Sequence, residues 1–222
     1  MRNRNTSVRY PGGWNVLWGV AAYVVGYLFV LVAFGRGIER ILESVTVSTQ
    51  DEPLAVAAVV EEAGVSATTG AGWLFYNAHF VSITVPRPDQ NPVLVNLILE
   101  DGGATLVLLG VPPLLLVAAG VAVTRTASTY TELRFDLGGP KARYALNGGV
   151  VTMLGYLPLA IFGGIVFSVS AGIRVAPDLF SAFALAGLVY PLVFGGVGGL
   201  LVSRGAERPS MEERGIGWGN RE

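Results

Sequence analysis

The chain has 222 residues, of which 52% are apolar and only 14% are charged, whereas a soluble domain carries about 25% charged residues. Together with a mean hydropathy of +0.55, this composition indicates a membrane protein and excludes intrinsic disorder. Fifteen basic residues against sixteen acidic ones give a net charge of −1, which excludes nucleic acid as a partner on bulk charge.

The residue types that usually carry site chemistry are scarce. The chain has no cysteine, which excludes disulfide scaffolds, thiolate metal sites and cysteine nucleophiles. Its single histidine, His79, excludes any zinc or haem site that needs two imidazoles. The sequence also lacks a P-loop, a dinucleotide-binding fingerprint and a nucleophile elbow. We therefore expect no cofactor, no metal and no catalytic residue.

Four runs without Asp, Glu, Lys, Arg or His are long enough to cross a bilayer, since a helix needs roughly 20 apolar residues to span about 30 Å of hydrocarbon. They cover residues 14–34, 105–124, 150–170 and 179–202. The first run is too long for the apolar region of a signal peptide, about 7–15 residues, so we interpret it as a retained anchor. The predicted connections are residues 35–104, 125–149 and 171–178, with tails at 1–13 and 203–222.

The distribution of Lys and Arg predicts the orientation of these spans. Eleven of the 15 basic residues fall in the two tails and the second connection, and four fall in the first and third connections. Because cytoplasmic loops carry the excess of Lys and Arg, both termini are predicted to be cytoplasmic. The chain is then a multi-pass protein of the cell membrane, with the lipid bilayer as its first partner.

The first connection, residues 35–104, must fold as a small extracytoplasmic cap. It carries nine acidic residues against three arginines, a net charge of −6. Such a cap could concentrate cations or keep the protein soluble in high salt, or it could simply be a solvated acidic surface.

Within this cap we predict one helix and one hairpin. Asp51 and Pro53 are typical of a helix start and Gly64 of its end, with an apolar stretch at residues 54–60 between them. Residues 79–85 and 92–99 are predicted to be two strands joined by a turn at residues 86–91.

Between the predicted helix and hairpin lie four aromatic residues, an amide and the only imidazole. The candidate ligand-binding residues here are Trp73, Tyr76, Asn77 and His79. One interpretation is a ligand pocket or a pH-sensitive contact, because histidine titrates near physiological pH. The other is an interfacial aromatic anchor in which Asn77 and His79 bond to backbone groups.

The nonapeptide WLFYNAHFV at residues 73–81, followed by spans that include a Pro-Pro pair, resembles a family of uncharacterised multi-pass membrane proteins of halophilic archaea. The predominance of arginine, the acidic loops and the absence of cysteine agree with that resemblance. Members of the family are sometimes labelled as transporter-like, and the resemblance implies no catalytic or binding residues.

The predicted spans contain no ionisable Asp, Glu, Lys, Arg or His, which argues against a proton-coupled carrier. They do contain small residues spaced by four, which lie on one face of a helix. Such a face allows close helix packing, or it could line a narrow pore. The helix-packing candidates are Ala160, Gly164, Ser168 and Gly172 in the third span, and Gly187, Gly195 and Gly199 in the fourth.

Prolines mark possible kinks at Pro112, Pro113, Pro158 and Pro191. A proline removes a helix hydrogen bond, and the carbonyl it frees needs a partner inside the protein. Interrupted helices could line a cavity, as in transporters, although proline is also common in membrane helices generally.

The sequence therefore predicts an all-α membrane protein with four transmembrane helices and a small α+β extracytoplasmic cap between the first and second. The favoured function is a non-enzymatic membrane component or transport-related subunit, as a homo-oligomer or with other membrane subunits. The alternatives are a small channel or facilitator, and a membrane-anchored external sensor or binding module. An enzyme is the least supported class.

Overall fold

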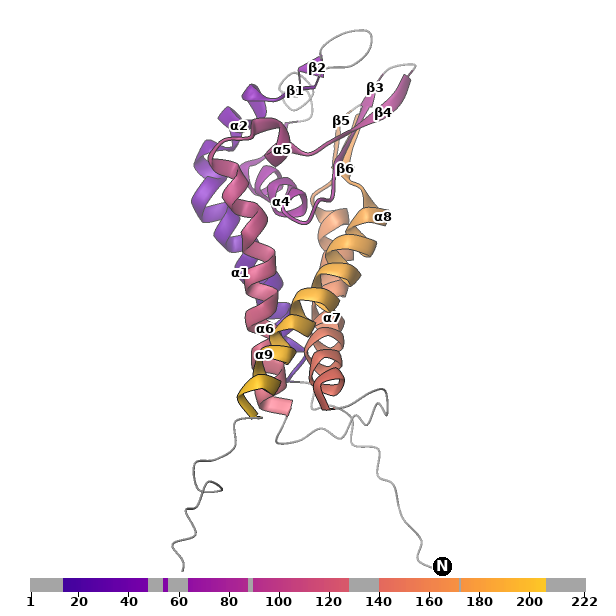
Figure 1. Ribbon diagram of the computed structural model, residues 1–222. Helices are drawn as coiled ribbons and strands as arrows, with labels where there is room; N and C mark the ends of the chain where they lie inside the picture. Colours follow the sequence, from indigo (N-terminus) through magenta and orange to yellow (C-terminus); the bar gives the residue numbers. More distant parts are fainter. Residues whose placement is uncertain are drawn as a thin grey trace, which may run out of the picture.

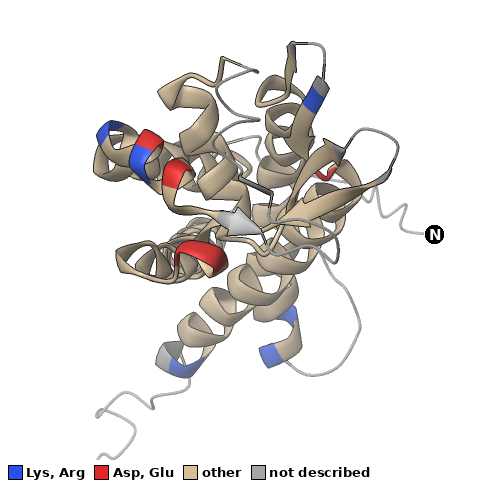
Figure 2. Cartoon of the chain, turned by 90° about the horizontal axis from the view of Figure 1, so that it is seen from above, with Lys and Arg blue, Asp and Glu red and all other residues tan. Residues whose placement is uncertain are grey.

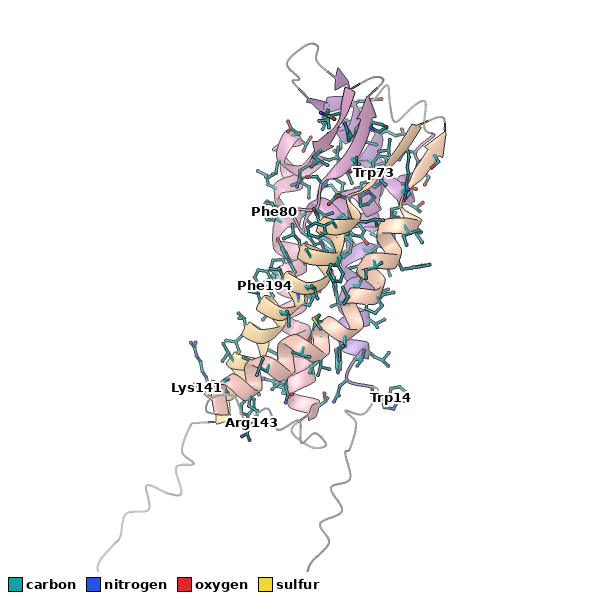
Figure 3. All side chains as sticks on the ribbon, turned by 90° about the vertical axis from the view of Figure 1, so that its right-hand side faces the viewer. Trp14, Trp73, Phe80, Lys141, Arg143 and Phe194 are labelled. Carbon is teal, nitrogen blue, oxygen red and sulfur yellow. The ribbon has the colours of Figure 1, made fainter. Side chains whose placement is uncertain are left out.

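The computed structural model describes residues 14–47, 54–55, 64–87, 90–127, 140–171 and 173–206. Most of these residues are helical, and short antiparallel strands gather at one end of the molecule (Figure 1). We call this end the cap end. The opposite end, which carries Trp14, Lys141 and Arg143 (Figure 3), is called the terminal end.

Four helical stretches are long and apolar enough to cross a membrane, and they overlap the four predicted spans. The two stretches nearer the N-terminus consist of α1 (Leu17–Phe34), η1 (Gly35–Gly37) and α2 (Ile38–Ser44), then η2 (Ala104–Gly110) and α6 (Val111–Ala127). The other two consist of α7 (Pro140–Val166), then α8 (Leu179–Ser181), η3 (Ala182–Val189), η4 (Pro191–Gly195) and α9 (Gly196–Ala206).

The third helix differs from its predicted span at both ends. It begins at Pro140 rather than at residue 150, because proline suits the first turn of a helix and helix-forming residues follow it. It ends at Val166 rather than at residue 170, because Val169 and Ser170 pair with Val175 and Arg174 in a short antiparallel sheet. Ser168 therefore lies beyond the helix, and Gly172 lies outside the described residues.

Glycines bring the spans into close contact toward the terminal end. A Cβ atom on Gly19 of α1 would collide with the carbonyl oxygen of Thr152 in α7. A Cβ atom on Gly120 of α6 would collide with the carbonyl oxygen of Gly195 in η4. Small residues at such positions let helix backbones approach closely, so this half of the bundle is held by backbone-to-backbone packing.

Toward the cap end the spans separate, and helix α4 (Ala67–Asn77) lies between them (Figure 1). The helix begins after Ser66, whose Oγ accepts a hydrogen bond from the backbone N–H of Thr69 at 3.2 Å. Every residue from Gly70 to His79 is buried. A segment of the first connection thus forms part of the interior of the molecule.

The cap end carries a four-stranded antiparallel sheet in the order β4-β3-β6-β5. Strands β3 (Ile83–Arg87) and β4 (Gln90–Val95) form a hairpin where one was predicted, but with other bounds: β3 begins at Ile83 rather than at residue 79, and both strands extend into the predicted turn at residues 86–91. Strands β5 (Val169–Ala171) and β6 (Ile173–Pro177) come from the third connection, and β6 pairs with β3. The sheet therefore joins the first and third connections, which were predicted as separate loops.

Two predictions for the cap are wrong in part. Residues 92–99 are not one strand, because Asn96 caps the short helix α5 (Leu97–Asp101) by accepting from the backbone N–H groups of Ile98 and Leu99. The predicted helix that starts at Asp51 is contradicted at Leu54–Ala55, which pairs as strand β2 with β1 (Thr46–Val47). The rest of that predicted helix, up to residue 63, lies outside the described residues.

The charged residues that the structure describes lie toward the two ends of the bundle, in η1, α2, α5, the strands and the ends of the long helices, and the apolar lengths between are free of them (Figure 2). Arg125, Lys141, Arg143 and Arg204 lie near the helix ends at the terminal end of the bundle. The acidic residues Glu39, Glu43, Glu100 and Asp101 belong to α2 and α5 at the cap end. The apolar lengths match what a bilayer requires.

Candidate functional site

The four predicted binding residues lie together in the second half of α4 and the turn after it. Trp73, Tyr76, Asn77 and His79 are each at most 1% exposed. Their side chains face protein on the inside of the bundle, and Figure 3 shows Trp73 within the cap end. We call the set formed by these four residues and their hydrogen-bond partners the α4 junction.

His79 joins α4 to the third span. Its Nδ1 lies 2.8 Å from the carbonyl oxygen of Phe75, and its Nε2 lies 2.7 Å from the hydroxyl of Tyr156 in α7. A carbonyl oxygen can only accept, so Nδ1 carries the proton. Burial lowers the pKa of His79 from its ordinary value of 6.5 to about 4, so the ring is neutral at physiological pH. Nε2 therefore accepts the hydrogen bond that the Tyr156 hydroxyl donates.

Tyr76 joins α4 to the first and third spans. Its hydroxyl donates to the carbonyl oxygen of Ala160 in α7 and lies 3.1 Å from the hydroxyl of Tyr23 in α1. Because Tyr76 has one hydroxyl proton and gives it to Ala160, Tyr23 donates within the tyrosine pair. Burial raises the pKa of Tyr76, which keeps its hydroxyl protonated and able to donate.

Asn77 and Trp73 complete the junction with backbone partners. The Asn77 Nδ2 group donates to the carbonyl oxygen of Val81 at 2.7 Å, and its Oδ1 accepts from the backbone N–H of Leu97 at 2.9 Å. The Trp73 indole donates to the carbonyl oxygen of Phe167 at 2.7 Å. These bonds fix the turn after α4 against α5, and the second half of α4 against the residue that follows α7.

The fourth span contacts the α4 junction through Tyr190. Its hydroxyl donates to the carbonyl oxygen of Ala78 at 3.5 Å, and its ring centroid lies 5.0 Å from that of His79. On the other side, the ring of Phe75 contacts His79 edge-on with 4.9 Å between centroids. The single imidazole is thus enclosed by aromatic rings, with protein partners for both nitrogens.

The sequence prediction found the α4 half of the junction and missed the half in the spans. Tyr23, Tyr156 and Tyr190 were counted only as uncharged residues of apolar runs. A signal was present, because a buried tyrosine hydroxyl needs a hydrogen-bond partner and lipid offers none. The partners, however, lie 53, 77 and 112 residues away along the chain, and no local pattern pairs them.

The junction also bears on the prediction that the spans contain no ionisable Asp, Glu, Lys, Arg or His. That prediction holds for the spans themselves, but α4 brings His79 from the first connection to Tyr156, within the third span. Because the pKa of His79 is lowered by burial, the imidazole there serves as a neutral hydrogen-bonding group.

Most of the predicted helix-packing residues that the structure describes lie at contacts between elements, whereas the Ser168 hydroxyl bonds to the carbonyl oxygen of Gly164 in its own segment. Gly187 faces Leu157, Gly195 faces the carbonyl oxygen of Gly148, and Gly199 faces the carbonyl oxygen of Tyr144. In the third span, Ala160 is fully buried at the junction, and a Cβ atom on Gly164 would lie 2.9 Å from Cδ2 of Leu179.

Among the described residues, no group of three or more His, Asp or Glu side chains could hold a metal ion. The buried side-chain oxygen or nitrogen atoms of that part of the chain have partners, except for Oγ1 of Thr152. What the junction can do chemically is accept and donate hydrogen bonds, and each of its four predicted residues already makes them within the protein.

A family model described as a family of unknown function, DUF7978, matches residues 2–206. No curated protein and no solved structure matches the chain.

Proposed function

The chain belongs to the DUF7978 family of unknown function, and on that premise we propose that it is a non-enzymatic component of the cell membrane that acts as a subunit of a larger membrane assembly. Both termini are cytoplasmic in this proposal, and the strands and α2 form an extracytoplasmic cap. The partners are the lipid bilayer and either further copies of the chain or other membrane subunits.

One observation carries the proposal: the polar groups that could have formed a site are used to hold the molecule together. Tyr76 and His79 bond to Ala160, Tyr23 and Tyr156. Unpaired polar groups are costly at membrane depth, and here the paired ones fix α4 between the spans. A rigid bundle with an attached cap suits a protein that presents a fixed surface to partners.

The exposed apolar surface of the spans supports an assembly role as well as contact with lipid. Val32 on the first span is 82% exposed, Leu114 on the second is 72% exposed, and Phe162 on the third is 62% exposed. Helix association in membranes uses packing and small residues rather than the hydrophobic effect, so any of these faces can receive a partner helix.

Site-specific photo-crosslinking in the native membrane tests the proposal. A photoreactive amino acid is placed at Val32, Leu114 or Phe162 in turn, with buried Ala160 as the control position. We expect protein adducts from one face, and a matching assembly in native mass analysis from mild detergent. A monomer that gives lipid adducts alone from all three exposed positions would contradict a subunit role.

A second function, a small facilitator, is favoured by one specific observation. The fourth span is π-helical through η3 and η4, and Pro191 is the first residue of η4. Such π-helical turns occur frequently at functional sites. Purified protein in vesicles that passes small cations at a rate reduced by Pro191→Ala would favour this function. Absence of flux from correctly folded protein would exclude it.

A further inference from the structure

The side chain of Phe80 is much more exposed than those of the residues before it. The ten residues before it, from Gly70 to His79, are all buried, whereas the Phe80 side chain is 50% exposed. Figure 3 shows it at the outside of the bundle, whereas Trp73 of the same segment lies within. The side chain is large and apolar, and it has no atom that could form a hydrogen bond.

Phe80 is also the only non-glycine residue with a positive φ in the part of the chain that the structure describes, with φ of 58°. It occupies the left-handed position that ends α4, where the backbone N–H of Phe80 donates to Asn77 and that of Val81 donates to Tyr76. Glycine is the usual residue at this position. A phenylalanine that accepts the steric cost of this conformation indicates that its ring is needed there.

Two hydrogen bonds place Phe80 beside the cap-end half of the fourth span. Two residues after Phe80, the carbonyl oxygen of Ser82 accepts from the backbone N–H of Asp178, just before the span, at 2.9 Å. Two residues before Phe80, the carbonyl oxygen of Ala78 accepts from the hydroxyl of Tyr190 inside the span. Phe80 is therefore bracketed between the last charged residue before the span and a residue within the span.

The backbone around Phe80 meets the requirement for irregular structure near a membrane. Non-helical backbone is tolerated there only where the protein pairs its polar groups. The carbonyl oxygens of Phe75, Ala78 and Val81 accept from the side chains of His79, Tyr190 and Asn77, respectively. The turn is paired on its inner side and exposes an aromatic ring on its outer side.

From these observations we propose that Phe80 is a lipid contact: α4 crosses the bundle wall between the spans and presents this ring to the acyl chains of the outer leaflet. The first connection then contributes directly to the membrane-facing surface. The inference rests on the membrane placement in the proposed function, and it is independent of whether the chain is a subunit of an assembly.

The absence of cysteine makes the test direct. Single variants Phe80→Cys, Phe162→Cys and Glu43→Cys carry a nitroxide spin label in phosphatidylcholine vesicles, and collisions with oxygen and with a water-soluble nickel chelate are measured. Phe162 is an exposed apolar residue of the third span, and Glu43 is an exposed charged residue of α2. We expect the label at position 80 to collide with nickel several-fold less often than the label at position 43, while still colliding with oxygen.

The outcomes separate the inference from its premise. Nickel access at position 80 equal to that at position 43, with position 162 protected, overturns the lipid contact alone. Nickel access at position 162 overturns the membrane placement and the inference with it. A label at position 80 that neither reagent reaches indicates a covering protein and also overturns the lipid contact.

A second measurement on the unaltered protein guards against a variant that does not fold. Vesicles are prepared with a phospholipid that carries a diazirine in its acyl chain, and adducts are mapped by peptide mass analysis after illumination. We expect an adduct at Phe80 in wild-type protein. Adducts on the spans without any at Phe80 overturn the proposal.

Discussion

At the scale of single residues, His79 matters because its neutral form is built into the α4 junction. Nε2 accepts from Tyr156, and a proton there would reverse this hydrogen bond and place a positive charge in an enclosed aromatic environment. The other titratable side chains facing the ring, Tyr156 and Tyr190, are hydroxyls that bring no compensating negative charge. Protonation of His79 therefore opposes the folded state.

This argument predicts a loss of stability in acid. The folded-state pKa of about 4 lies below the ordinary value of 6.5, so the contribution of His79 is fully present above pH 6.5. It is lost as the pH falls toward 4, up to about 3 kcal/mol over this range. Thermal unfolding in detergent between pH 6.5 and pH 5, above most carboxylate titrations, measures the effect. His79→Gln can keep both hydrogen bonds without titrating, and an unchanged acid slope in this variant would contradict the assignment.

The left-handed conformation of Phe80 gives a second prediction at this scale. Phe80→Gly and Phe80→Ala both remove the ring, but only glycine adopts a φ of 58° without a steric penalty. The glycine variant should be more stable than the alanine variant by about 1 kcal/mol. Equal unfolding temperatures of the two variants in detergent would show that the positive φ carries no cost.

At the scale of elements, the fourth span explains why small residues recur every four positions. A regular α-helix has 3.6 residues per turn, so residues four apart drift around its surface. The wider π-helical turns of η3 and η4 counteract that drift, and Gly187, Gly195 and Gly199 all remain on the side that faces α7. The periodicity in the sequence therefore matches a helix that alternates between the two geometries.

This packing predicts a strong position dependence for glycine substitution. Gly199→Ala places a methyl group against the carbonyl oxygen of Tyr144, whereas a Cβ atom on Gly110 meets nothing within 4 Å. Gly199→Ala should destabilise the protein by roughly 2 kcal/mol, and Gly110→Ala should be neutral or slightly stabilising, because alanine favours a helix over glycine. Thermal unfolding of both variants in the same detergent compares them, and equal losses would mean that Gly199 is not at a tight contact.

What the sequence could predict depended on how local each signal was. The uncharged runs located the four long helices, and the two predicted strands around a turn located the β3–β4 hairpin, although not its bounds. Helix α4 was not predicted, because Gly70 and Gly72 disfavour a helix and its stability comes from burial among the spans. The pairing of β3 with β6, and of His79 with Tyr156, joins distant parts of the chain, which periodicity cannot report.

At the scale of the whole molecule, the two halves of the bundle are held by different chemistry. Near the terminal end, Gly19, Gly120 and Gly195 bring backbones together. Near the cap end the spans separate around α4 (Figure 1), and tyrosine hydroxyls with one imidazole bridge the distance. The first connection is therefore divided, with the strands, α2 and α5 at the cap end and α4 inside the bundle.

The two ends of the bundle also allow a test of its orientation in the membrane. The distribution of basic residues predicts that the terminal end faces the cytoplasm. Glu43 and Arg143 are exposed near opposite ends of the bundle. In intact cells, a membrane-impermeant maleimide should label Glu43→Cys, whereas Arg143→Cys should react only after the membrane is opened. The reverse pattern would invert the orientation. Labelling of both variants in intact cells would contradict a bilayer crossed between the two ends, because residues at these ends would then share one aqueous side.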